Sequence, residues 1–292
     1  MAIETLGYRG WSGALRWPWL ACWPIVRTGL WLVLRRKVFW LLLALGLFNF
    51  LLHFAIIYTK ATISVENPRA GRFLDNFRVT GTGEAYLDFM FAQGTVTMLL
   101  LAFAGSILVG GDYQQGGLVF YLSRRIDRRH YVLGKLLAIA AIVLMITTAP
   151  ALALFLEYGM LSSSLDYFLE NPRILLGIVG YGLLMAAVLS LLLGAIASWV
   201  HRAVPLVMIW AGIFVLLPVL GENLRHVRDN RLWRLLSLWR DLRMLGKSFF
   251  GSLRVERDEP ELAYWAAWIV PAVCLVCLLL LVRRVRAVEV VK

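Results

Sequence analysis

Six long apolar segments constrain this chain more than any other feature of its sequence. A helix that crosses about 30 Å of hydrocarbon needs about 20 mainly apolar residues. Six segments have about that length: 38–58, 86–109, 131–156, 174–200, 203–220 and 263–282. Because the bilayer core has no water to satisfy backbone polar groups, each segment is expected to be helical. The sequence therefore predicts an all-α integral membrane protein with six transmembrane helices in a single domain, 1–292.

The overall composition indicates the same class. Of the 292 residues, 60% are hydrophobic and only 16% are charged, whereas about 25% charged residues is usual in soluble domains. This excludes a soluble enzyme and a disordered or disulfide-stapled chain. The formal net charge of +12 favours an anionic partner. Because the basic residues lie mostly between apolar segments, that partner is expected to be membrane lipid, and no nucleic acid is expected.

The basic residues also predict the orientation of the chain. Arginine and lysine concentrate in the leader 1–37, in the link between the second and third segments, and in the C-terminal tail. Such residues favour the cytoplasmic side. We therefore expect a multi-pass protein of the inner (cell) membrane with cytoplasmic N- and C-termini, and with 60–85 and 162–171 outside. In the leader, tryptophan and leucine recur at near-helical spacing, which suits an interfacial helix.

One connection conflicts with this orientation. Segment 222–262 holds nine basic residues, yet six spans place it outside. Its seven acidic residues and its spaced leucines and tryptophans suit an amphipathic loop lying on the outer membrane surface. The alternative is a cytoplasmic loop, which would make the segment with Pro205 and Pro218 re-entrant instead of spanning.

Residues that could carry chemistry inside the membrane are scarce. His53, Asp88 and Lys135 lie toward the ends of their segments, and the last three segments contain no charged side chain. An ion-coupled carrier needs ionisable groups in the membrane interior. Residues 246–248 read Gly-Lys-Ser, but Asp241 stands where a phosphate-binding loop requires glycine. We therefore expect a chain that is not an enzyme, with no catalytic residue, metal or cofactor.

The most informative stretch joins the second and third segments. It reads Gly-Gly-Asp-Tyr-Gln-Gln-Gly-Gly-Leu-Val-Phe-Tyr-Leu-Ser-Arg-Arg-Ile-Asp-Arg-Arg over 110–129, and Gly-Lys-Leu follows at 134–136. A positive-inside loop would explain the arginines alone. A short amphipathic helix at the cytoplasmic surface explains more of the pattern, with Asp127 able to pair with neighbouring arginines.

This stretch resembles the permease subunits of ATP-binding cassette (ABC) transporters, in the exporter class called type 2. In that family an acidic residue, a Gly-Thr-Leu-like step, a Leu-Ser-Arg-Pro-Ile-like step and an arginine-rich turn ending in Gly-Lys-Leu join the second and third spans. Here Gly117 replaces the common Thr, and Arg125 the common Pro. The resemblance implies that 111–130 is a coupling helix that docks on a separate ATP-binding subunit. The residues implied are Asp112, Gly116, Gly117, Arg124, Arg125, Asp127, Arg128, Arg129, Gly134 and Lys135.

The same resemblance implies a function for the whole chain. It would be the permease, paired as a homodimer or with a second permease, and would couple ATP hydrolysis by its partner to substrate export or mechanical work. Two other classes remain open. One is a secondary carrier or channel, which the charge-poor spans disfavour, and the other is a non-transporting scaffold subunit, to which the loop 222–262 could belong.

Overall fold

The computed structural model describes residues 22–66, 81–114, 128–161, 166–228, 230–254 and 259–284. Over these residues the regular structure is entirely helical. Six helical segments among them are long and apolar enough to cross a membrane: Lys37–Thr62, Gly83–Gly110, Arg128–Leu161, Pro172–Trp199, Ala203–Arg228 and Glu259–Arg284. The prediction of an all-α multi-pass membrane protein with six candidate spans is therefore confirmed.

The described residues form fifteen helical elements. In order they are α1 (Cys22–Leu34), α2 (Lys37–Glu66), α4 (Gly83–Gly105), η2 (Ser106–Gly110), α5 (Gly111–Gln114), α7 (Arg128–Ile146), α8 (Thr148–Leu161), α9 (Asp166–Glu170), α10 (Pro172–Trp199), α11 (Ala203–Ala211), η3 (Gly212–Leu216), α12 (Leu217–Arg228), η4 (Arg231–Leu236), α13 (Leu238–Phe250) and α14 (Glu259–Arg284). The elements η2 and η3 are π-helical turns inside longer helices, and η4 is a 3-10 helix.

The third span is interrupted once, between α7 and α8. Pro150 has no backbone N–H, so the carbonyl of Ile146, four residues earlier, loses its helical donor. The Val143 carbonyl accepts from the backbone N–H of Thr147 at 2.9 Å and from the Thr147 hydroxyl at 2.8 Å, so helical bonding continues up to the break. The break is therefore a local consequence of proline in an otherwise continuous span, as membrane helices tolerate.

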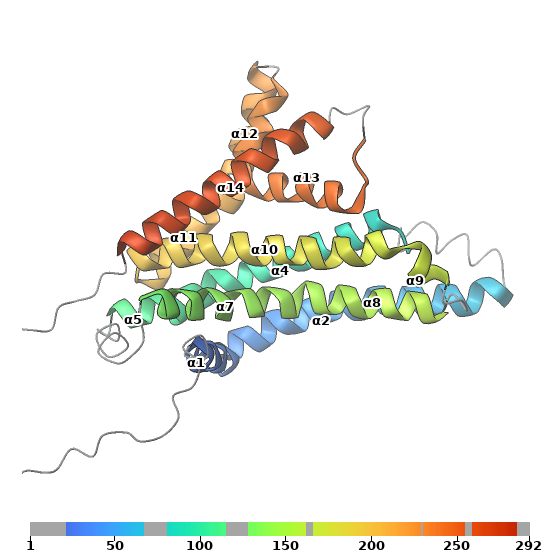
Figure 1. The fold of residues 1–292 in the computed structure, drawn as a ribbon, viewed down its shortest axis with the longest axis horizontal. Helices are drawn as coiled ribbons and strands as arrows, with labels where there is room; N and C mark the ends of the chain where they lie inside the picture. The colour runs from blue at the N-terminus through green and yellow to red at the C-terminus, as the bar shows by residue number, and fades with distance from the viewer. Residues whose placement is uncertain are drawn as a thin grey trace, which may run out of the picture.

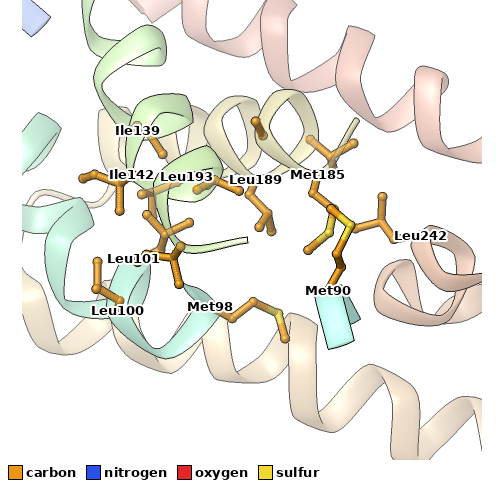
Figure 2. Packing of buried hydrophobic residues seen from close by; sticks show 14 of the residues in the cluster. Met90, Met98, Leu100, Leu101, Ile139, Ile142, Met185, Leu189, Leu193 and Leu242 are labelled. Atoms are coloured by element: carbon orange, nitrogen blue, oxygen red, sulfur yellow. The ribbon is translucent and has the colours of Figure 1, made fainter. Parts of the chain in front are cut away.

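Helix α10 lies at the centre of the bundle and contacts α4, α7, α8, α13 and α14 (Figure 1). The buried core forms where these helices meet. Figure 2 shows Met90 and Met98 of α4, Ile142 of α7 and Leu189 of α10 among the side chains of this core. Small residues allow the close approach that membrane helices need. A Cβ atom added at Gly182 of α10 would lie 2.0 Å from the Thr148 hydroxyl oxygen of α8.

Three spans lie at the periphery of the bundle. The most apolar windows of α2, of α11 to α12 and of α14 are only 17%, 11% and 22% buried, against 50% or more for the other three spans. Large apolar side chains such as Phe48, Met208 and Leu279 are exposed on them. These faces are therefore available to lipid or to another membrane subunit.

The segment 222–262 forms the end of α12, η4, α13 and the start of α14. Helix α13 packs against α4, α10 and α14, with Leu242 fully buried and Trp239 stacked on Phe91 at 4.6 Å between ring centroids. The apolar face of α13 is thus covered by the neighbouring helices α4, α10 and α14. Glycines on the facing helices make room for it, since Gly94 abuts Trp239 and Gly177 abuts Phe250.

The basic residues of this segment are extensively paired with acids. Arg243 contacts Asp88 at 2.6 Å, and Lys247 contacts Glu259 at 2.6 Å. Glu222 takes part in several pairs at once, with Arg225, His226, Arg234 and Arg240. The charge that conflicts with the predicted orientation is therefore partly neutralised inside the fold.

Candidate functional site

The candidate site lies at the end of the bundle where α5 and the start of α7 meet (Figure 1). Of the residues expected there from the sequence, Asp112 lies in α5, while Arg128, Arg129, Gly134 and Lys135 lie in α7. The remaining five lie outside the described residues: Gly116, Gly117, Arg124, Arg125 and Asp127. The structure therefore describes the two ends of the predicted coupling segment.

A buried ion pair joins these two ends. The Lys135 ammonium lies 2.7 Å from a carboxylate oxygen of Asp112, and the two side chains are only 7% and 18% exposed. The Tyr131 hydroxyl donates to the same carboxylate oxygen at 2.8 Å. Tyr131 and Lys135 lie four residues apart and therefore on one face of α7. Together they hold α5 against the first two turns of α7.

The lysine makes a second contact that extends the cluster into the second span. Its ammonium donates to the carbonyl of Leu108 at 2.6 Å. Leu108 lies in the π-helical turn η2, between α4 and α5. Such turns alter the regular backbone pairing of a helix and occur often at functional sites. Asp112, Tyr131, Lys135 and the Leu108 carbonyl are called the base clamp below.

Helix α1 packs directly on the base clamp. At Gly134, an added Cβ atom would lie 2.9 Å from Cβ of Ile25 and 3.2 Å from the carbonyl oxygen of Cys22. On the facing helix, an added Cβ atom at Gly29 would lie 3.2 Å from Cβ of Ala138 and 3.3 Å from Leu108. Two glycines, one on each helix, therefore bring α1 into contact with both α7 and η2.

The connection between the fourth and fifth spans reaches the same region. A Cβ atom at Gly110 would lie 2.6 Å from the backbone carbonyl oxygen of His201. Arg284, at the end of the sixth span, donates to the Ser198 carbonyl at 3.3 Å and lies over the Trp199 ring at 5.3 Å. The ends of five spans thus meet around or beside the base clamp, together with α1.

The surface around the base clamp is basic. Exposed arginines and lysines from several elements gather at this end of the chain's helices: Arg35, Arg36, Lys37, Arg128, Arg129, Arg202, Arg283 and Arg284. Asp112 does not neutralise them, because its carboxylate is engaged with Lys135 and Tyr131. This arrangement can bind an acidic protein surface or anionic headgroups.

Sequence reasoning identified part of this cluster and missed part of it. It selected Asp112, Gly134 and Lys135, which the structure brings together, but it did not select Tyr131 or the Leu108 carbonyl. The spacing of Tyr131 and Lys135 was the available signal, since residues four apart share a helix face. The carbonyl of Leu108 had no sequence signal, because every residue carries a backbone carbonyl and only the fold brings this one to Lys135.

No model of a known protein family matches this chain, and no curated protein matches it either. The fold defines the class at the level of a multi-pass, all-helical membrane protein. Among the described residues, no group of three or more His, Cys, Asp and Glu side chains is placed to hold a metal ion.

Proposed function

We propose that this chain is the membrane-spanning permease subunit of an ABC transporter. It works as a pair of permeases with two separate ATP-binding subunits, in the inner membrane, with cytoplasmic termini. The partner subunits hydrolyse ATP, and the permease uses the resulting movement for substrate export or mechanical work. Segment 111–130 is the docking point.

The base clamp is the observation that carries this proposal. The 2.7 Å contact between Asp112 and Lys135 joins α5 to α7, the helices on either side of residues 115–127. A partner that pushes on this segment therefore displaces the second and third spans together. A loop with no mechanical role would not require a buried ion pair at its base, because exposed connections tolerate movement at little cost.

The contacts around the base clamp supply a path for that displacement. Helix α1 would move with these spans because it packs against Gly134. The turn before the fifth span would also move, because the His201 carbonyl contacts Gly110. Packed helices respond to such a push as rigid bodies that slide or rotate relative to one another. Movement at one end of the bundle would thereby change the separation of spans at the other end.

The exposed arginines give the docking point its chemistry. Arg128 and Arg129 are solvent-exposed and begin α7, within one turn of Tyr131 of the base clamp. An acidic groove on the ATP-binding subunit would complement them, and such complementarity sets partner choice and association rate. The other basic residues at this end would contact anionic lipid headgroups.

Purification of the full chain from its native membrane under mild detergent tests the proposal. We expect a complex of two permease chains with two subunits that carry a phosphate-binding loop and hydrolyse ATP. Transport by the purified chain alone in liposomes, driven by an ion gradient, would instead identify a secondary carrier. A stable complex that neither hydrolyses ATP nor transports would identify a scaffold.

A further inference from the structure

A second cluster of charged residues surrounds a cavity, and the residues that line it, 234–262, lie far along the chain from the base clamp. The cavity has a volume of about 240 Å³ and lies among η4, α13 and the start of α14. Its lining includes three arginines, Arg234, Arg240 and Arg243, with Asp241 and Glu259. Leu235, Met244 and Leu262 supply apolar wall, which lowers the local dielectric constant and strengthens electrostatic contacts.

The acidic groups in and around this cavity are already engaged. Glu222 accepts hydrogen bonds from both Arg225 and Arg240, and its distance to Arg234 is 3.7 Å, too long for a hydrogen bond. Glu259 accepts from Lys247 at 2.6 Å and from the backbone N–H of Arg254 at 2.8 Å. Glu222 therefore faces three arginines, while Arg243 pairs with Asp88 at 2.6 Å and Lys247 pairs with Glu259. The five basic groups of this cluster outnumber the three carboxylates paired with them.

Two donors in the cluster have no acceptor. The Nε atoms of Arg234 and Arg243 are both buried without a hydrogen-bond partner. Burial, and next the nearby charge of Arg225, lower the pKa of Arg234, and the nearby Glu222 carboxylate offsets only part of this effect. Asp241 compensates only in part, since it is 1% exposed and burial raises the pKa of its carboxyl to about 7.

We propose that this cavity binds the phosphate group of a ligand, and specifically the headgroup of a membrane phospholipid. Arginine forks suit phosphate because they offer paired donors in a plane. A phosphate here would supply acceptors for the unpaired donors and balance the surplus charge. Helix α14, whose span is among the least buried, borders the cavity through Glu259 and Leu262, and this peripheral position gives a lipid lateral access. The inference stands independently of the proposed ATP-binding partner.

Binding of phosphatidylglycerol to the purified full chain in detergent tests this site. Native mass spectrometry counts the bound lipid, with diacylglycerol as the phosphate-free probe and inorganic phosphate as the soluble competitor. We expect one saturable phosphatidylglycerol per chain and no comparable binding of diacylglycerol. Persistence of the lipid at high inorganic phosphate assigns the site to lipid, whereas displacement at equal concentrations would overturn the lipid source and leave a soluble phosphate site.

Matched variants separate this site from general lipid contact. Arg234→Gln with Arg243→Gln should weaken phosphatidylglycerol binding at least tenfold. Arg254→Gln removes the same kind of charge from an exposed side chain paired with Glu84, outside the cavity lining, and should leave binding unchanged.

Met244→Trp fills the cavity and keeps every charge, so it should weaken binding even where the double arginine variant does not fold. Unchanged affinity in Met244→Trp, or equal affinity for diacylglycerol, would overturn the proposal. Equal losses in Arg254→Gln and the double variant would overturn it as well, since they would indicate a nonspecific charge effect.

Discussion

Separating the two charges of the base clamp should cost a large part of this protein's stability. Asp112→Asn removes the carboxylate that balances the Lys135 ammonium, which is only 7% exposed and also donates to the Leu108 carbonyl. Breaking a buried pair from one side typically costs about 3–5 kcal/mol, because an uncompensated charge stays buried. Lys135→Met leaves Asp112 with 18% exposure and the Tyr131 hydroxyl, so we expect a smaller loss of about 2–3 kcal/mol.

The double variant distinguishes a pair from two independent side chains. Because it removes both charges, Asp112→Asn with Lys135→Met should cost less than the sum of the single variants, with a coupling free energy of about 1.5–3 kcal/mol. Unfolding in mixed micelles, followed by tryptophan fluorescence, measures all four proteins. The exposed pair Arg254–Glu84, at 44% and 41% side-chain exposure, is the control, and its cycle should give about 0–1 kcal/mol. Additive losses at Asp112 and Lys135, within about 0.5 kcal/mol, would refute the reasoning.

Three further predictions concern other parts of the chain. Burial raises the pKa of Asp241 from 3.8 to about 7, so the folded protein holds this proton more tightly and loses stability as pH rises from about 4 to 7. Asp241→Asn should therefore be more stable than the parent at pH 8, by at most about 4 kcal/mol in the free energy of unfolding, and should unfold at a higher temperature. A pH dependence of stability identical to that of the parent would contradict this. Gly134→Val should clash with Ile25 and detach α1, seen as protease sensitivity of the leader with the spans still inserted; a leader as resistant as in the parent would argue against this packing. After removal of the three native cysteines, a cysteine at Leu169 should react with an impermeant reagent only from outside and one at Arg202 only from inside, and the reverse pattern would invert the proposed topology.

The apolar segments predicted the six candidate spans but not their ends. The fifth was expected over 203–220 and continues to Arg228, and the sixth begins at Glu259, four residues before the predicted start. Hydropathy detects the length that meets lipid, whereas helical hydrogen bonding continues into charged turns beyond it. The break at Thr147 had a visible cause in Pro150, because proline removes a backbone donor.

Tertiary contacts between distant segments were beyond the sequence. Its periodicity indicated an amphipathic helix within 222–262, but amphipathicity does not specify whether lipid or protein covers the apolar face. That choice depends on grooves at Gly94 and Gly177, which exist only once α4 and α10 are packed. The partner of Asp112 likewise required the fold, since Lys135 lies on a different helix.

The most direct test of the proposed coupling role is ATP hydrolysis by the purified complex after charge reversal beside the base clamp. Arg128→Glu with Arg129→Glu alters two exposed side chains, so insertion and thermal stability should remain close to those of the parent. Arg202→Glu with Arg283→Glu reverses the same number of charges at the same end of the bundle, outside segment 111–130, and serves as the control.

We predict that the Arg128 and Arg129 variant inserts and pairs normally but no longer retains or stimulates the ATP-binding subunit, while the control keeps most of that stimulation. Full partner binding with undiminished, substrate-responsive ATP hydrolysis in the Arg128 and Arg129 variant would contradict the account.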